Sequence, residues 1–322
     1  MSLDLLRRLT GQFFSLAILW VGGGAATAQD YPNKPLRIVT SEAGGGNDLQ
    51  ARLIAQGLTL AFGQQVIVEN RPSGVVPGDI VAKAPPNGYT LLLYNNTLWI
   101  GPLIQTTPYD AVRDFAPITS VARAANVLVV NTALPVKSVA DLVALARAKP
   151  GELNYGSAGT GASNHLAAEL FRTLAHIDIV RINYKGAGPA LTALLAGELQ
   201  LMFPTAGAVT PHIKAGRVKA LAVTSAEPSA LFPGLPTVAA SLPGYESISI
   251  YGVFAPAGTP SPIIGRLNVE IVRFLNRAEV KEKFFNAGME AAGGTPGELA
   301  ATLKSEVGRM GRVIKNAGIR GE

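Results

Sequence analysis

Strand-like and helix-like segments alternate along nearly the whole chain. The run 36–40 has the composition of a buried strand, and apolar side chains then recur at helical spacing over 48–62. The alternation continues into the C-terminal part, where helices are predicted over 262–276 and 278–287, followed by a last helix that begins at the capping box 295–298. This pattern predicts an α/β fold with largely parallel sheets.

The first 28 residues are typical of a removable export signal. Two arginines at 7–8 precede a nine-residue, largely apolar stretch, 13–21, and the small residues 26–28 form a cleavage site. A membrane anchor needs about 20 apolar residues, which this stretch does not reach. We therefore predict a periplasmic protein that is cleaved after Ala28.

The composition limits the classes of function. The chain has 322 residues and no cysteine, which excludes disulfides, thiolate catalysis and cysteine zinc sites. Its formal net charge is +6, but the basic residues are scattered, whereas a nucleic-acid-binding face needs them clustered. We therefore predict no nucleic-acid partner. Because residues 29–322 reach the size, roughly 250–300 residues, at which single cores stop growing, we expect two domains.

Two glycine-rich turns, 41–48 and 156–165, each follow a predicted strand and open a predicted helix. Such a turn exposes backbone N–H groups at the positive end of the helix dipole, which suits an anion. The second turn is also a near miss to the dinucleotide-binding fingerprint, because its third glycine is absent. It has three interpretations: a cofactor site, a tight turn without a ligand, or a cradle whose N–H groups and hydroxyls bind a small anion. We favour the cradle, and we expect both turns to face one ligand.

The two turns and two further positions supply the candidate ligand-binding residues. Glu42 is unusual in such a place, because a carboxylate beside an anion site repels the anion. It either points away or accepts a hydrogen bond from an amine or hydroxyl of the ligand. Asp48 has the position of a helix cap, and Lys185 either adds a positive charge at a helix start or is solvated. The complete set is Ser41, Glu42, Gly44, Gly45, Asn47, Asp48, Ser157, Thr160, Gly161, Ser163, His165, Lys185 and Thr205.

Groups that would indicate catalysis are missing from the sequence. His165, His176 and His212 are isolated and have no partner at metal-ligand spacing. Ser157 or Ser163 with His165 gives neither a Gly-x-Ser-x-Gly elbow nor a clear third member of a triad. Neither glycine turn carries a P-loop lysine. We therefore predict a binding protein and no enzyme, with no metal and no cofactor.

A series of motifs extends over the chain after the export signal. It consists of Tyr31-Pro32-Asn33-Lys34-Pro35, Gly44-Gly45-Gly46-x-Asp48, Val68-Glu69-Asn70-Arg71-Pro72, Asn87-Gly88-Tyr89-Thr90, Asp114-Phe115-Ala116-Pro117, Tyr155-Gly156-Ser157-Ala158-Gly159, Tyr184-Lys185-Gly186, His212-Ile213-Lys214-Ala215-Gly216 and Phe254-Ala255-Pro256-Ala257-Gly258. In this order the motifs resemble those of the Bug-type receptors, the extracytoplasmic solute-binding components of tripartite tricarboxylate transporters.

The resemblance implies a type II periplasmic-binding-protein fold, in which two α/β domains flank a ligand cleft and close on the ligand by a hinge motion. By this analogy, domain 1 comprises 30–128 plus 247–322 and domain 2 comprises 129–246. The implied ligand is a small carboxylate, the implied partners are membrane transporter subunits that bind transiently, and we expect a monomer. The alternatives are a ligand-sensing subunit of a signalling system and a hydrolase that uses the same cleft.

The chain departs from the pattern of this family at three places near the implied pocket. Thr40-Ser41-Glu42 stands where the family usually has a proline-aromatic-proline or alanine lead into the first turn. Pro204-Thr205 stands where Asp-Asn is frequent, and Ile250 stands where a tryptophan is usual. The family's ligands therefore cannot be transferred to this chain. From Glu42 we expect a ligand that carries a donor group or only one carboxylate.

Overall fold

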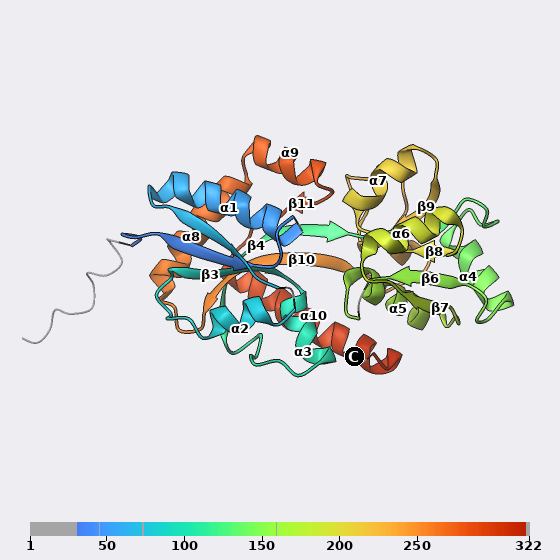
Figure 1. Ribbon diagram of the computed structural model, residues 1–322, viewed down its shortest axis with the longest axis horizontal. Helices are drawn as coiled ribbons and strands as arrows, with labels where there is room; N and C mark the ends of the chain where they lie inside the picture. Colours follow the sequence, from blue (N-terminus) through green and yellow to red (C-terminus); the bar gives the residue numbers. More distant parts are fainter. Residues whose placement is uncertain (1–30, 45, 73, 159, 320–322) are drawn as a thin grey trace, which may run out of the picture.

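Two sheets covered by helices make up the fold (Figure 1). The computed structural model describes residues 31–319 except 45, 73 and 159, and the predicted export signal lies outside these residues. The described strands form a six-stranded sheet in the order β11-β4-β10-β3-β1-β2 and a five-stranded sheet in the order β7-β6-β8-β5-β9. We call the six-stranded sheet with its helices the first lobe and the five-stranded sheet with its helices the second lobe.

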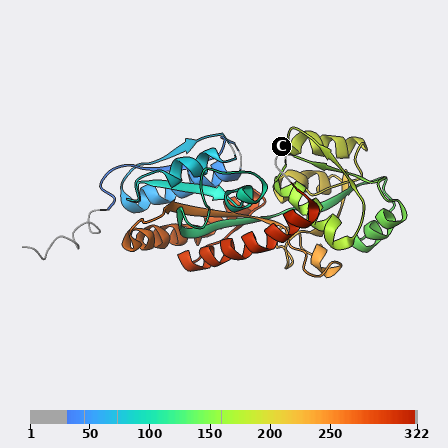
Figure 2. The same ribbon diagram turned by 90° about the horizontal axis from the view of Figure 1, so that it is seen from below.

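Both ends of the described chain contribute to the first lobe (Figure 1 and Figure 2). Its elements are β1 (Leu36–Thr40), α1 (Gly46–Phe62), β2 (Val66–Asn70), α2 (Val76–Ala82), β3 (Thr90–Asn95), α3 (Thr97–Ile104), β4 (Phe115–Ala125), β10 (Ile248–Pro256), α8 (Ser261–Leu275), α9 (Ala278–Asn286), β11 (Glu290–Ala291) and α10 (Pro296–Ala317). The second lobe contains β5 (Val127–Asn131), α4 (Val139–Ala148), β6 (Asn154–Ser157), α5 (Ser163–Ala175), β7 (Val180–Asn183), α6 (Ala187–Ala196), β8 (Leu201–Met202), α7 (Ala206–Lys214), β9 (Val218–Val223) and the 3₁₀-helix η1 (Val238–Ala240).

Most helix boundaries follow from local signals in the sequence. Helix α10 begins at the predicted capping box, in which Thr295 and Glu298 bond to each other's backbone N–H groups. Helix α4 begins after Ser138, and α6 ends at Gly197, whose φ of 86° is in the left-handed region that glycine favours. Strand β4 was not predicted, because its alanines, polar residues and Pro117 form neither an apolar run nor a strict alternation.

The prediction of largely parallel sheets is wrong, since both sheets are mixed. The pairs β1–β2, β1–β3, β6–β7 and β6–β8 are parallel. Strand β10 is antiparallel to β3 and β4, β11 is antiparallel to β4, and β5 is antiparallel to β8 and β9. The reason is the connection between the lobes, because β4 carries the chain out of the first lobe and β10 brings it back. An apolar run shows that a strand is buried but does not show its direction.

The chain passes between the lobes at two places that lie side by side. At the first crossing, Asn126 joins β4 to β5; its side chain donates to the Phe203 carbonyl oxygen at 2.7 Å, and its N–H donates to Thr224 Oγ1 at 2.8 Å. At the second crossing, Ser247 leads into β10, and its N–H donates to the Thr224 carbonyl oxygen at 2.9 Å. Thr224 therefore holds both crossings together.

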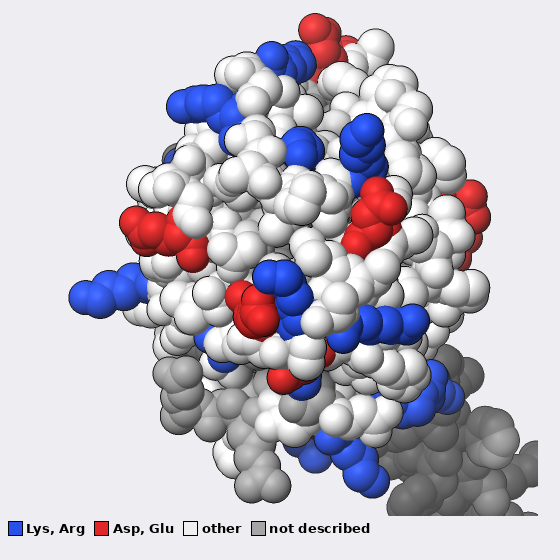
Figure 3. All heavy atoms as spheres, turned by 90° about the vertical axis from the view of Figure 1, so that its right-hand side faces the viewer, with Lys and Arg blue, Asp and Glu red and all other residues white. Residues whose placement is uncertain are grey.

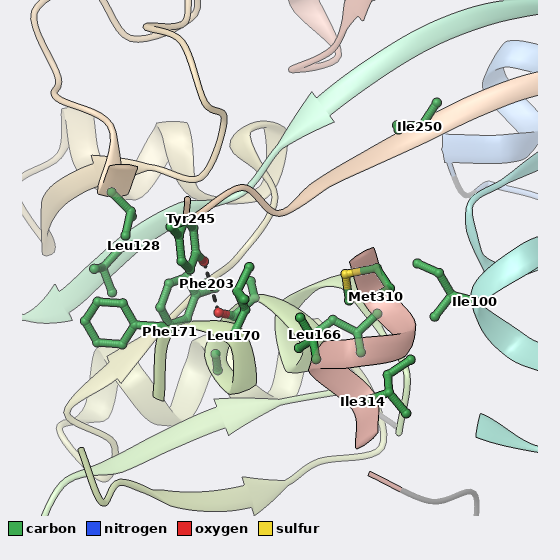
Figure 4. Packing of buried hydrophobic residues seen from close by; sticks show 14 of the residues in the cluster. Ile100, Leu128, Leu166, Leu170, Phe171, Phe203, Tyr245, Ile250, Met310 and Ile314 are labelled. Atoms are coloured by element: carbon green, nitrogen blue, oxygen red, sulfur yellow. Dashed lines mark hydrogen bonds between the residues drawn. The ribbon is translucent and has the colours of Figure 1, made fainter. Parts of the chain in front are cut away.

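An apolar core continues from the first lobe into the second. Figure 4 shows Leu166 of α5 beside Met310 of α10, with Ile100 of α3 on the other side of Met310. Deeper in the second lobe, the rings of Phe171 and Phe203 pack with centroids 5.6 Å apart. Helix α10 therefore connects the lobes by apolar packing, although it belongs to the C-terminal part of the chain.

The surface at the end of the second lobe carries charges of both signs. Figure 3 shows lysine and arginine interspersed with aspartate and glutamate over this face, between larger uncharged areas. On this face, therefore, the basic residues are scattered, as the sequence indicates. Within the described ranges, no helix combines the length and the apolar character that crossing a bilayer requires.

Candidate functional site

A cavity of about 290 Å³ lies where the two lobes meet. The first lobe contributes the end of β3, the start of α3, the start of β10 and one turn of α10. The second lobe contributes the second glycine turn, the start of α5 and the residue before α7. The lining residues are Asn95, Asn96, Thr97, Ile100, Gly161, Ala162, Ser163, Leu166, Thr205, Ser247, Ile248, Ser249, Tyr251, Glu306, Arg309 and Met310.

Three helix N-termini converge on this cavity. The N-cap residues of α3, α5 and α7 are Asn96, Ala162 and Thr205, and all three line it. None of these three side chains accepts a capping hydrogen bond from its helix, although Asn95 Oδ1 accepts one from the Thr97 N–H at 3.3 Å. The positive ends of three helix dipoles thus meet at one place, which favours a negatively charged ligand group.

The side chains around the cavity are mainly neutral hydrogen-bonding groups. Tyr251 is one of them, and burial raises the pKa of its phenol despite an opposing hydrogen bond with Ser249, so it remains a donor at neutral pH. Ile100, Leu166 and Met310 form an apolar part of the wall (Figure 4). The cavity therefore offers donors for an anionic group and an apolar surface for a carbon chain.

The charged members of the lining are one acid and one base, and they neutralise each other. Glu306 and Arg309 lie one turn apart on α10, with 2.7 Å between Arg309 Nη2 and Glu306 Oε1. Both are largely buried, with side-chain exposures of 10% and 22%. The described lining thus contains no arginine or lysine whose charge is free for a ligand.

The second glycine turn is built around an arginine. Arg181 of β7 donates to Ser157 Oγ at 2.8 Å, to Thr160 Oγ1 at 3.2 Å and to the Ala158 carbonyl oxygen at 3.2 Å. Gly161 has a φ of 82°, which a residue with a side chain rarely adopts. A cation from the neighbouring strand therefore fixes the turn that contributes Gly161 to the cavity.

The first glycine turn is built around an aspartate. Asp48 accepts hydrogen bonds from the Gly44 N–H at 2.9 Å, from Arg52 Nε at 3.1 Å and from Asn70 Nδ2 at 2.8 Å. Burial alone would raise the pKa of Asp48, but these hydrogen bonds outweigh it and hold the pKa below its ordinary value. The buried carboxylate therefore organises this turn from inside.

The structure brings only some of the predicted site residues to the cavity. Gly161, Ser163 and Thr205 line it, and Ser157, Thr160 and His165 lie behind them within the second turn. Lys185 is exposed in the loop between β7 and α6. In the first turn, Asn47 donates to Ser41 Oγ, Asp48 is buried, and Glu42 and Gly44 are exposed; Gly45 lies outside the described residues.

The first turn nevertheless borders the cavity. A Cβ built on Gly46 would lie 3.1 Å from the Tyr251 hydroxyl, and Tyr251 lines the cavity. None of the described residues of 41–48 is itself part of the lining. Tyr251 therefore lies between the first turn and the cavity that the second turn lines.

Sequence reasoning missed five residues that matter here: Asn95, Asn96, Arg181, Glu306 and Arg309. Asn95 and Asn96 come just after the apolar run 91–93 and Tyr94, so a polar segment at the end of an apolar run was an available signal. The three charged residues gave no such signal. Arg181 stands in an ordinary strand pattern, and Glu306 and Arg309 stand in an ordinary helix pattern.

The arrangement of Ser157 and His165 is unlike that of a nucleophile and its base. Ser157 Oγ accepts a hydrogen bond from Arg181, and His165 Nδ1 accepts one from the Gly161 N–H at 3.1 Å. Within the described residues there is also no group of three or more His, Cys, Asp or Glu side chains that could hold a metal ion. The geometry favours binding at this site.

The chain is similar to known proteins over most of its length. Residues 50–319 match the family model described as the tripartite tricarboxylate transporter family receptor. The chain is 37% identical over 290 residues to the UPF0065 protein in the tcbD-tcbE intergenic region of Pseudomonas sp. (strain P51), which covers 88% of this chain and 86% of that protein. It is 35% identical over 301 residues to protein BugT of Bordetella pertussis, with 91% and 92% covered.

Solved structures with similar folds extend the comparison. R. palustris Rpa4515 with adipate has 36% sequence identity and a TM-score of 0.78, covering 91% of this chain and 100% of that chain. MatC from Rhodopseudomonas palustris with bound malate has 27% identity and a TM-score of 0.74, with 88% and 100% covered.

Proposed function

Because the chain belongs to the tripartite tricarboxylate transporter receptor family, we propose that it is a periplasmic solute-binding protein that captures a small carboxylate between its two lobes. It delivers this ligand to the membrane subunits of a tripartite transporter, which it contacts transiently as a monomer. The family is one of receptors and not of enzymes. The adipate and malate bound by two similar solved proteins support the choice of a carboxylate.

The observation that carries the proposal is the meeting of three helix N-termini at a cavity whose acid and base neutralise each other. Each helix N-terminus carries about half a positive charge together with unpaired N–H groups. A carboxylate is therefore bound by N–H and O–H donors rather than by a dedicated cation. A volume of about 290 Å³ is just below the range for ligand sites, roughly 300–1,000 Å³, and so it fits a small acid.

Ligand binding is coupled to a hinge in this proposal. The two domains are those predicted from the sequence, 30–128 plus 247–322 and 129–246, and the hinge lies at the crossings near Asn126 and Ser247. A rotation there would move Ser163 and Thr205 of one lobe against Asn96 and Tyr251 of the other. Because both lobes supply lining residues, the complete site exists only when the lobes are close together.

Thermal unfolding in the presence of candidate acids tests the proposal. The panel contains succinate, adipate, glutarate and benzoate, with sucrose and inorganic phosphate as controls. A ligand at about 100 times its Kd stabilises the folded state by ~2.7 kcal/mol, which raises the Tm of a protein of this size by about 4 °C. Calorimetric titration then gives the Kd. If phosphate stabilises the protein as well as every carboxylate does, the proposed selectivity for carboxylates is wrong.

A further inference from the structure

One carboxylate oxygen in the cavity is buried without a partner. Glu306 lines the cavity, and only 7% of the residue is exposed. Its Oε1 accepts a hydrogen bond from Arg309 Nε at 2.8 Å and lies 2.7 Å from Arg309 Nη2 in an ion pair. Its Oε2 is buried and has no hydrogen-bond partner among the described residues. The acid thus makes one-sided contact with its base and leaves an acceptor open.

Arg309 is held in place from two sides. In addition to its hydrogen bond and ion pair with Glu306 Oε1, its Nη1 donates to the Glu246 carbonyl oxygen, which lies just before the second crossing between the lobes. The guanidinium therefore binds α10 to the crossing segment. Turning it toward Glu306 Oε2 would break that link, so Arg309 does not supply the missing donor.

A buried acceptor without a partner is costly. Leaving a buried polar group unsatisfied destabilises the folded state, and the destabilisation is larger when the group is charged. Native proteins rarely keep such groups unless water or a ligand satisfies them. Glu306 Oε2 is therefore an acceptor in the wall of this cavity, below its surface, and a rotation of the Glu306 side chain would present it to a donor on the ligand.

We propose that Glu306 selects ligands that carry a hydroxyl or amino group in addition to a carboxylate, by accepting a hydrogen bond from that group. The inference rests on the proposed function, because it assumes that a carboxylate occupies the same cavity. The ligand carboxylate lies at the helix N-termini, its carbon chain contacts Ile100, Leu166 and Met310, and its donor binds the Glu306 carboxylate. The ligand class is hydroxy- and amino-substituted carboxylic acids.

Matched acids and an isosteric variant test this selection. Kd values are measured by calorimetry for succinate, malate and aspartate, which share one carbon skeleton, and for adipate and 2-aminoadipate, which share another. The wild-type protein is expected to bind the substituted acid of a series at least about 10-fold more tightly, as a hydrogen bond to a charged group implies. In Glu306→Gln, which replaces the acceptor by an amide and removes the negative charge, this preference falls to about equal binding or reverses.

Controls separate this effect from folding and from general charge effects. Glu282→Gln makes the same change on the exposed face of α9 and should leave every Kd ratio unchanged. Glu42→Gln removes the exposed carboxylate of the first turn, for which the sequence predicted, as one of two alternatives, a contact with a donor of the ligand, and so it tests that alternative. If Glu306→Gln does not fold, Glu306→Asp replaces it in the test. This variant keeps the negative charge but shortens the side chain, so it should retain only part of the preference for the substituted acid.

The outcomes distinguish the two proposals. Wild-type protein that binds none of the acids contradicts the proposed function. Wild-type protein that binds substituted and plain acids equally, or a Glu306→Gln variant that weakens both by the same factor, overturns the role of Glu306 and leaves the proposed function standing. A preference that disappears in Glu42→Gln instead assigns the selection to the first turn and also overturns the inference.

Discussion

The two glycine turns look alike in sequence, but opposite charges organise them. The first turn, 41–48, surrounds the carboxylate of Asp48, whereas the second, 156–165, is held by the guanidinium of Arg181. A turn that closes around an anion already has its N–H groups directed toward a negative charge. A turn held by a cation keeps its positive field for a ligand, although the N–H groups of Ala158 and Gly161 already donate to Asn164 Oδ1 and His165 Nδ1. In agreement with this difference, described residues of the second turn line the cavity, and those of the first do not.

The difference teaches that a glycine turn before a helix does not by itself indicate an anion site. Both turns follow a strand, both contain a glycine with positive φ, and both open a helix. The two turns differ in the charged side chain that forms hydrogen bonds with them and in the position of that side chain in the sequence. Asp48 is part of its own turn, whereas Arg181 lies more than a strand away in sequence.

Removing the arginine should have the largest effect. Arg181→Met deletes the bonds to Ser157, Thr160 and Ala158 but keeps an unbranched side chain of similar length. We expect ligand affinity to fall by about 10- to 100-fold and the free energy of unfolding to fall by ~1–3 kcal/mol. Calorimetric titration and denaturant unfolding measure the two quantities. Arg181→Lys should recover only part of the affinity, because an ammonium cannot reproduce the planar fork of donors; full recovery would mean that charge alone matters.

Alanine at matched glycines should separate the turns next. Gly161 and Gly44 have φ values of 82° and 84°, so alanine at either position is strained by about 1–2 kcal/mol. Only at Gly161 would the new Cβ meet a neighbour, Ile104 Cδ1 of the other lobe at 2.9 Å. We therefore expect Gly161→Ala to weaken ligand binding by about 10-fold, whereas Gly44→Ala leaves the Kd within about 2-fold. Equal losses of affinity in the two variants would show that both turns contact the ligand.

The sequence predicts the local elements well and their three-dimensional combination less well. Strand β1, the cap of α10 and the glycine end of α6 follow from residues close in the chain, because the signals act over a few positions. The direction of β10 and the place of β4 depend on pairing between segments more than a hundred residues apart. The hydrophobic periodicity within one segment gives no information on which distant segment pairs with it.

The candidate site shows the same limit at the level of single residues. Ser163 and Thr205 lie at helix starts, and the sequence marks helix starts. Glu306 and Arg309 lie in the middle of a long helix, where an acid and a base three residues apart are typical of a solvated face. They reach the cavity because α10 packs between α3 and α5, and only the fold shows this contact. Residues whose role depends on distant packing are therefore the ones that sequence reasoning misses.

Acid should affect the two turns differently, and the variant that tests this should have the smallest effect on ligand affinity. Asp48→Asn should lower the free energy of unfolding by ~1–3 kcal/mol at neutral pH, because it weakens the bonds to Gly44, Arg52 and Asn70, and it should leave the ligand Kd nearly unchanged. Since the folded-state pKa of Asp48 is lowered, its stabilisation is fully present above the ordinary carboxyl pKa, near 4, and is lost as the pH falls through the lower folded value.

The difference in Tm between wild type and Asp48→Asn should therefore be constant from about pH 8 to about pH 5 and shrink below about pH 4. A guanidinium keeps its charge throughout this range, so the difference between wild type and Arg181→Met should persist at low pH. Thermal unfolding of the three proteins at each pH measures both differences. If the two differences shrink together, the stability of the second turn also depends on a titrating carboxylate, and the contrast between a turn built on an anion and a turn built on a cation is wrong. If only the Asp48 difference shrinks, the charge that organises each turn has been identified independently of any ligand.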